Sequence, residues 1–303
     1  MDDFEIIDVH ADLARTLEEE SNYWLIPGRR AGDRLVIPEK VIEYMDQSSI
    51  SNMAFMILIP RQSRDPLVEK AKTPQLPKEQ RQKERERISQ QVAALIREMN
   101  EWGCELGERY PRLLPFPCLS DDLGGSEDIG KELELRFSQG AKGIRLHPGM
   151  FSFFPDAEKF WPVYEKCEEL ELPILADSEP WPPSYVLATY PLFFQMPRSH
   201  IDYGESKNWI RVLEPFPHLT IILAHLGSVR WDERIERAQN YPNVYFDTSQ
   251  GFSAPDRIPV VPHRSPGEED AVRAFHKINN VRNWFSGGCT TATVGTNTAP
   301  SPD

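Results

Sequence analysis

Polar side chains that can bind an ion or move a proton stand at the ends of several short apolar runs. They are His10, Asp12, His147, Asp177, Glu179, His225 and Asp247. Imidazole nitrogen and carboxylate oxygen are ligands that suit Zn²⁺, Mn²⁺ and Fe²⁺. A bound ion lowers the pKa of its water, and a histidine that is not a ligand can then transfer protons. These residue types therefore predict metal-assisted acid–base chemistry, if one fold brings the ends of the runs together.

The first pair, in "DVHAD", has the most informative spacing. Residues i and i+2 of a β-strand point to the same face, so His10 and Asp12 could reach one ion. A single His or Asp at a strand end more often anchors a loop through hydrogen bonds. Both interpretations stay open for His147 and Asp177, and Asp247 is expected to cap or position a loop.

Short apolar runs alternate with helical patterns along the chain. The runs expected to form strands are Glu5–His10, Asn52–Ile59, Arg112–Leu119, Lys142–His147, Pro173–Asp177, Thr220–His225, Asn243–Thr248 and Val281–Phe285. Several are apolar throughout, which is typical of parallel strands buried on both faces. A strand–helix unit repeated about eight times predicts an α/β fold of the (β/α)₈ barrel type, in which catalytic residues gather at the C-terminal ends of the strands. A doubly wound open sheet is the alternative, but the chain has no GxGxxG or GxxxxGK[ST] loop.

The rest of the chain divides into helices, one insertion and a tail. Helices are expected over 78–109, 156–171, 231–240 and 267–277, and the polar segment 61–87 is expected to be a solvated loop and helix face. The aromatic, proline-rich segment 177–204 follows a strand end and is expected to form a lid or wall of the substrate site, or a loop packed on a helix. We expect a single barrel domain over 1–286, with a disordered tail over 287–303.

Composition and charge limit the classes of partner. The 303 residues carry a formal net charge of −13, which argues against nucleic acid or an anionic membrane as the main partner. The four cysteines form no CxxC pair and are expected to be reduced thiols. The N-terminus has no signal-peptide pattern, and no apolar run approaches the roughly 18 residues that span a bilayer. We therefore expect a cytoplasmic protein that acts on a small molecule.

Several motifs together resemble one family. The segments "IIDVHAD", "GAKGIRLHPGM", "LPILADSEP", "LTIILAHLG" and "YPNVYFDTS" resemble the amidohydrolase-related proteins, the metal-dependent barrel hydrolases that include the aminocarboxymuconate-semialdehyde decarboxylase group. The resemblance is clearest over 140–249 and in the first strand. It implies a distorted (β/α)₈ barrel, one divalent ion at the strand ends and a homodimer. His10 matches the family's first ligand, and His225 matches the histidine that works as acid or base beside the metal.

Three positions depart from the family pattern. The family has a second His in the first strand, a His in the fifth and an Asp in the eighth, where this chain has Asp12, Asp177 and Gly288. No helix is recognisable after that last position, so the eighth βα unit is expected to be incomplete. The aspartates could be oxygen ligands beside His10, which would shift the preference from Zn²⁺ towards Mn²⁺ or Mg²⁺. Alternatively the ion has been lost and the barrel is a binding protein or pseudoenzyme, or the coding sequence is misread after Phe285.

The resemblance implies a metal-dependent hydrolase that acts on a small organic substrate, aromatic or carboxylated. A non-oxidative decarboxylase of the same fold is the alternative. The residues expected to hold the ion are His10, Asp12 and Asp177. His225 is the expected acid or base, His147 is expected to face the substrate, and Arg145 is expected to pair with a substrate carboxylate.

Overall fold

The structure is a computed structural model that describes residues 7–16, 19, 37–57, 59, 77–151, 153–178, 203–224, 241–247 and 284–285. The helices expected over 231–240 and 267–277, most of the 177–204 insertion and the 287–303 tail lie outside the described residues. So do His225, Glu179 and Gly288.

The described strands all pair in parallel. They are β1 (Ile7–Leu13), β2 (Asn52–Ile57), β3 (Leu113–Phe116), β4 (Cys118–Leu119), β5 (Ile144–Leu146), β6 (Ile174–Ala176), β7 (Ile221–Leu223), β8 (Val244–Asp247) and β9 (Trp284–Phe285). Their order follows the chain, from β1 to β3 in one sheet and from β4 to β9 in the other. Each strand expected from the sequence has a counterpart among them.

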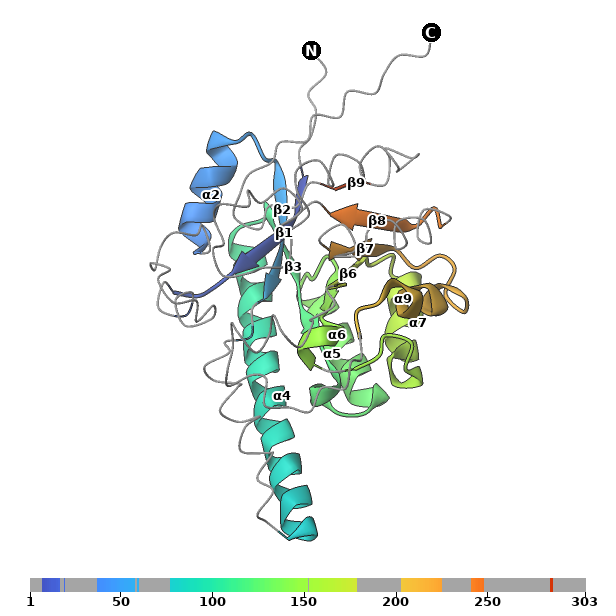
Figure 1. Ribbon diagram of the computed structural model, residues 1–303. Helices are drawn as coiled ribbons and strands as arrows, with labels where there is room; N and C mark the ends of the chain where they lie inside the picture. The colour runs from blue at the N-terminus through green and yellow to red at the C-terminus, as the bar shows by residue number, and fades with distance from the viewer. Residues whose placement is uncertain are drawn as a thin grey trace, which may run out of the picture.

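Pro117 alone separates β3 from β4, so these two strands together fill one position in the fold. A proline has no N–H to donate to the ladder, which explains the break. The nine described strands therefore fill eight positions, and β9 lies next to β1 (Figure 1). The described residues of β1 and β9 show no strand pairing. The fold is a (β/α)₈ barrel, as predicted.

Helices follow most strands. They are α2 (Pro38–Gln47), α4 (Lys78–Arg109), α5 (Ser126–Ser138), α6 (Pro148–Phe151), α7 (Trp161–Glu169) and α9 (Ser206–Leu213), with 3₁₀ turns η1 (Asp121–Leu123) and η2 (Glu158–Phe160). The helix expected over 78–109 is confirmed at both ends. The helix expected over 156–171 is shorter and divided into η2 and α7. Neither α2 nor α5 was predicted, although Pro38 at the first helical position and Asp128, which accepts from the Gly125 amide at 3.1 Å, are start signals.

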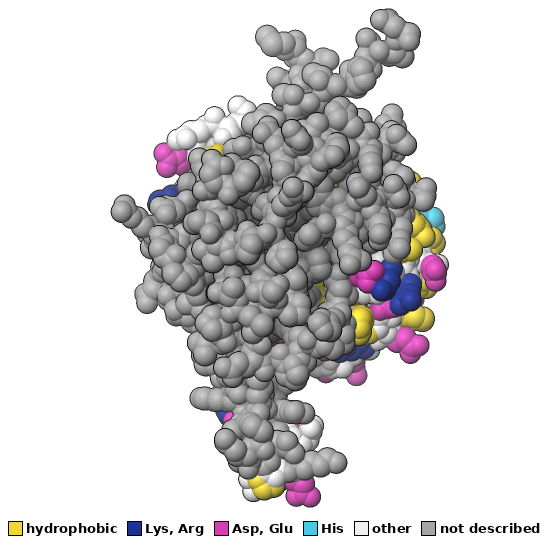
Figure 2. All heavy atoms as spheres, viewed as in Figure 1, with side chains coloured by type: hydrophobic (Ala, Val, Ile, Leu, Met, Phe, Trp, Pro, Cys, Tyr) yellow, Lys and Arg dark blue, Asp and Glu magenta, His cyan; other side chains and the backbone are white. Residues whose placement is uncertain are grey.

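The long helix α4 has two different halves. Its first turns project beyond the other described elements (Figure 1), and the described side chains of Glu79, Gln80 and Lys83 there are exposed. Further along, Val92 and Ile96 are buried against the barrel. The polar segment before Ile88 is therefore solvated where the structure describes it. Where described side chains reach the surface in Figure 2, Lys and Arg lie among Asp and Glu.

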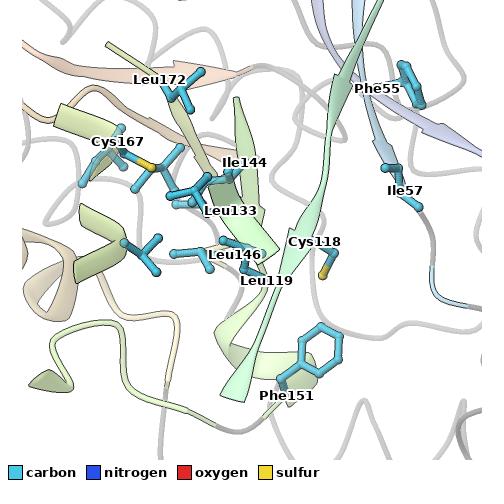
Figure 3. Packing of buried hydrophobic residues seen from close by; sticks show 14 of the residues in the cluster. Phe55, Ile57, Cys118, Leu119, Leu133, Ile144, Leu146, Phe151, Cys167 and Leu172 are labelled. Carbon is cyan, nitrogen blue, oxygen red and sulfur yellow. The ribbon is translucent and has the colours of Figure 1, made fainter. Parts of the chain in front are cut away.

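Two apolar clusters lie on opposite faces of the strands, one inside the barrel and one outside it. The cluster inside the barrel contains Val9, Ala54, Met56, Phe116, Leu175, Ile222 and Ala224. The other cluster joins the outer faces of the strands to the helices. Figure 3 shows part of it, with Ile144 and Leu146 of β5 beside Leu133 of α5 and near Cys167 of α7. Burial of these side chains supplies the main favourable term that holds helices on strands.

A buried polar network joins α4 and α5 to β4. Asn100 Oδ1 accepts from the Cys118 amide at 2.8 Å, and its Nδ2 donates to the Cys118 carbonyl at 2.9 Å and to Glu132 Oε1 at 3.0 Å. Arg136 Nε donates to the same carboxylate oxygen at 2.8 Å. The Asn100 amide group thus pairs with the backbone directly after the break at Pro117. We call Asn100, Glu132 and Arg136 the outer polar network.

The three described cysteines, Cys104, Cys118 and Cys167, are buried thiols. Burial raises the pKa of the Cys104 thiol to about 11, so this side chain stays protonated at neutral pH. These thiols therefore behave as core residues. None of the helices in the described part of the chain has both the length and the apolar character needed to cross a membrane.

Candidate functional site

A β-bulge in β1 sets the direction of the candidate ligands. Asp8 is opposite Met53 and Ala11 is opposite Phe55, so β1 uses one residue more than β2 between these two pairs. The backbone amide of His10, at the bulge, donates to Asp8 Oδ1 at 3.1 Å. The Asp8 carboxylate therefore supports the bulge. The sequence offered this signal, an acid two residues before the histidine, but the Asp8 role was not predicted.

The bulge turns His10 and Asp12 towards the inside of the barrel. Beyond it, Ala11 and Leu13 pack in the outer cluster, so Asp12, which lies between them, and His10, which precedes Ala11, face inward. Asp12 is opposite Met56, which belongs to the inner cluster. The strand also extends past the predicted end at His10, to Leu13. Both polar side chains therefore share one face near the C-terminal end of β1.

His10 is held by Asp247 from the end of β8. His10 Nδ1 lies 2.6 Å from Asp247 Oδ2, and both side chains are almost completely buried. Burial disfavours the protonated ring, but the neighbouring carboxylate outweighs this effect and raises the pKa of His10 above its ordinary value. When Nδ1 carries the proton and donates to Asp247, Nε2 carries the lone pair. Metal-binding histidines are commonly oriented by a carboxylate in this way.

Arg145 lies between two of the predicted oxygen ligands. It is opposite Leu175 of the inner cluster, so its side chain projects into the barrel. Its Nη1 is 3.7 Å from Asp12 Oδ1, and its Nη2 is 3.5 Å from Asp177 Oδ2. These separations exceed the roughly 2.7–2.9 Å of a close charge-assisted hydrogen bond. The guanidinium thus bridges the two carboxylates loosely.

Asp177 collects contacts from two strands. Its amide donates to the Leu146 carbonyl at 2.9 Å, which fixes the chain directly after β6. Its Oδ2 lies 3.2 Å from His147 Nε2. The next residue, Ser178, donates its Oγ hydrogen to the Ala224 carbonyl at 2.8 Å and so ties the end of β6 to the end of β7. The predicted acid or base, His225, follows Ala224 directly in the sequence.

We call His10, Asp12, Arg145, His147, Asp177 and Asp247 the inner polar cluster. It draws on β1, β8 and the C-terminal ends of β5 and β6, the end of the barrel where catalytic residues gather. Within the described residues, no three His, Cys, Asp or Glu side chains are close enough to hold a metal ion together. The predicted ligands His10, Asp12 and Asp177 nevertheless lie in one buried group, because the Arg145 guanidinium lies between the two aspartates and both Asp12 and Arg145 act electrostatically on His10.

A family model for amidohydrolases matches residues 7–285. The chain belongs to the amidohydrolase family. The match covers every described strand, and the resemblance read from the strand-end motifs is confirmed. No curated protein matches this amidohydrolase chain.

Solved structures share the amidohydrolase barrel. The 2,6-dihydroxybenzoate decarboxylase from Rhizobium has a TM-score of 0.58 at 17% identity, covering 95% of this chain and 87% of that one. A dihydroxybenzoic acid decarboxylase from Polaromonas sp. JS666, with bound manganese and the inhibitor 2-nitroresorcinol, has a TM-score of 0.59 at 15% identity, covering 93% and 85%. A probable 2-pyrone-4,6-dicarboxylic acid hydrolase from Acinetobacter baumannii, with citric acid bound, has a TM-score of 0.51 at 13% identity, covering 94% of this chain and 83% of that one. At these identities the likeness shows the fold.

Proposed function

We propose that this amidohydrolase is a metal-dependent hydrolase that acts on a small organic substrate bearing a carboxylate. The observation that carries the proposal is the His10–Asp247 pair at the C-terminal end of the barrel strands. A buried imidazole fixed through Nδ1 presents Nε2 as a ligand, and Asp12 lies on the same inner face. Family membership supports the reaction class.

The donor types of the inner polar cluster suit one divalent ion. The residues that would hold it are His10 through Nε2, Asp12 and Asp177. One nitrogen with several carboxylate oxygens favours Mn²⁺ or Mg²⁺ more than an all-histidine site does, whereas the family resemblance favours Zn²⁺. The Polaromonas decarboxylase holds manganese, which supports the harder ion.

When bound, the ion would polarise a substrate carbonyl and lower the pKa of a water molecule. The protein's own groups supply the remaining functions. Asp247 keeps the His10 ring in one orientation, and His225 is the proposed acid or base. Arg145 is proposed to pair with the substrate carboxylate, with His147 beside it. Burial strengthens each of these electrostatic contacts because water is excluded.

Non-oxidative decarboxylation is the second candidate. It is supported by the barrel shared with the Rhizobium and Polaromonas decarboxylases and by a buried arginine placed to bind a carboxylate. The products distinguish the two reactions. Hydrolysis of an ester, lactone or amide releases a new carboxylic acid, whereas decarboxylation of a hydroxybenzoate releases CO₂. Assaying both substrate classes with the Mn²⁺-reconstituted protein decides between them.

Metal content tests the proposed function before any substrate is known. The full chain, stripped with chelator and reconstituted with Mn²⁺ or Zn²⁺, is expected to hold about one equivalent of ion, and His10→Ala and Asp12→Ala are expected to lose it. A reconstituted wild type holding less than about a tenth of an equivalent would contradict the proposal and favour a catalytically silent barrel. We also propose that the protein is cytoplasmic and forms a homodimer. Light scattering of the purified chain measures its molar mass and so tests the homodimer.

A further inference from the structure

We propose that Arg145 competes with the divalent ion for the carboxylates of Asp12 and Asp177, and that this residue sets the metal affinity of the site. The inference rests on the proposed function, because it concerns the same ion. It adds a residue that opposes metal binding to the residues that would supply it.

The position of the guanidinium carries the argument. One nitrogen, Nη1, faces Asp12 Oδ1 and the other, Nη2, faces Asp177 Oδ2, at 3.7 and 3.5 Å. The Arg145 side chain and both aspartates are about 6% exposed, so the three charges interact with little screening by water. A metal ion binds carboxylate oxygen at about 2.0–2.2 Å. An ion at that distance from both aspartates would occupy the space between them, where the guanidinium now lies.

The contacts of Arg145 with these two aspartates are suited to exchange. Both are longer than a close charge-assisted hydrogen bond, so each is weaker than an ideal ion pair. Asp177 Oδ2 is shared with His147 Nε2, at 3.2 Å, so this oxygen keeps a neighbour when Arg145 leaves. The backbone of Arg145 is fixed independently, because its amide donates to the Pro117 carbonyl at 2.8 Å. The strand therefore stays in place when the side chain moves.

Displacement would link metal loading to substrate binding. While Arg145 bridges Asp12 and Asp177, its positive charge is compensated within the protein. Once an ion takes over these carboxylates, the guanidinium becomes available to the carboxylate of a substrate. The loaded protein therefore holds both cations that the proposed chemistry uses, whereas the metal-free protein holds a self-compensated cluster.

The test compares Mn²⁺ binding to the metal-free full chain and its variants by isothermal titration calorimetry. Arg145→Gln removes the competing charge and is expected to bind Mn²⁺ at least about tenfold more tightly than the wild type. Arg145→Lys keeps the charge without the two-pronged geometry, so its Mn²⁺ affinity is expected to lie between those of the wild type and Arg145→Gln. Arg97→Gln removes the same charge from α4, outside the barrel, where Arg97 pairs with Glu132 at 3.8 Å and is 43% exposed. Its Mn²⁺ affinity is expected to equal that of the wild type.

Each outcome decides a separate statement. Mn²⁺ affinity that is no higher in Arg145→Gln and Arg145→Lys than in the wild type overturns the competition and leaves the proposed function standing. Failure of Arg145→Gln to fold both with and without Mn²⁺ also overturns it, because Arg145 would then be needed for the fold. Absence of Mn²⁺ binding from the wild type and all variants overturns the proposed function itself. Binding by Arg145→Gln but not by the wild type supports the competition but contradicts the proposed function, because the wild-type protein would then hold no ion.

Discussion

Two buried arginines in this barrel have opposite kinds of surroundings. In the outer polar network, Arg136 donates from Nε to Glu132 at 2.8 Å, from Nη1 to Gln139 at 2.6 Å and from Nη2 to the Arg97 carbonyl at 3.2 Å. In the inner polar cluster, the ion pairs of Arg145 with Asp12 and Asp177 are 3.7 and 3.5 Å long. Both guanidinium groups are withdrawn from water, but the ion pairs of Arg145 with these two aspartates are longer than the hydrogen bonds of Arg136 to Glu132 and Gln139.

We infer that the difference separates a structural network from the proposed binding site. A buried charge is costly unless close hydrogen bonds compensate its lost hydration, and the outer network supplies them. In the inner cluster, the contacts of Arg145 with Asp12 and Asp177 have distances that a ligand can improve. Functional sites commonly keep such unoptimised contacts, because groups fully paired within the protein have little left for a ligand.

The largest expected effect on stability lies in the outer network. Glu132→Ala leaves Arg136 as a buried charge without its carboxylate and is expected to lower the free energy of unfolding by about 3–5 kcal/mol. Urea denaturation measures the loss. The matched control is Glu127→Ala on the same helix, whose ion pair with Lys131 is exposed, and no measurable change is expected there. A loss below about 1 kcal/mol in Glu132→Ala would remove the structural half of the comparison.

Asn100→Ala is expected to cost about 2–3 kcal/mol of the free energy of unfolding, because the Cys118 amide and carbonyl lose their partner next to Pro117. Gln91→Ala, at an exposed position of the same helix, serves as the control. Unchanged Mn²⁺ affinity in the folded Asn100→Ala protein is also expected. A variant as stable as the control would mean that the strand break needs no side-chain support.

Asp247→Asn moves the comparison to the inner cluster, with metal affinity as the measured quantity. The amide can donate to His10 Nδ1 instead of accepting from it, which reverses the favoured tautomer and orients Nε2 less well. Mn²⁺ affinity is expected to fall by about 10- to 100-fold, measured by calorimetry. Wild-type affinity in this variant would show that His10 is not a ligand.

The smallest effect is expected for Asp177→Asn in the metal-free protein. Arg145 keeps Asp12, and the lost attraction to Arg145 is offset because one negative charge leaves a cluster that holds several carboxylates, so the free energy of unfolding is expected to change by less than about 1 kcal/mol. Chemical denaturation with chelator present measures this change. A loss of about 3 kcal/mol or more would mean that the inner cluster holds the fold as the outer network does, and the contrast between the two arginines would disappear.

The barrel could be predicted from sequence because its strands are short apolar runs bounded by turns and helices. The run "MAFMILI" contains all of β2 except Asn52, and the run "LTIILA" contains β7. The helical pattern over 78–109 matches α4 at both ends. Less could be predicted where the local pattern was weak. The helices α2 and α5 begin with good start signals but were not recognised, and the break at Pro117 divided a run that appeared continuous.

The candidate site was only partly predictable, for a physical reason. Strand ends identify which side chains reach one end of the barrel, and the inner polar cluster contains the buried residues His10, Asp12 and Asp177, whose role as ligands stays a prediction. Which charge lies beside which depends on side-chain contacts between strands far apart in the sequence. The Arg145 bridge and the His10–Asp247 pair are contacts of this kind, the latter across 237 positions. Local spacing contains no information about them.

The bulge in β1 changes how its motif should be compared with other chains. In a regular strand the three polar residues of "DVHAD" would lie in a row on one face. Here the alternation changes phase once, so Asp8 belongs to the layer under the helices while His10 and Asp12 belong to the lumen. An alignment that matches Asp8 to a ligand of a relative without the bulge would pair an outward-facing residue with an inward-facing one. The acid at that position is better used as a marker that the phase change is present.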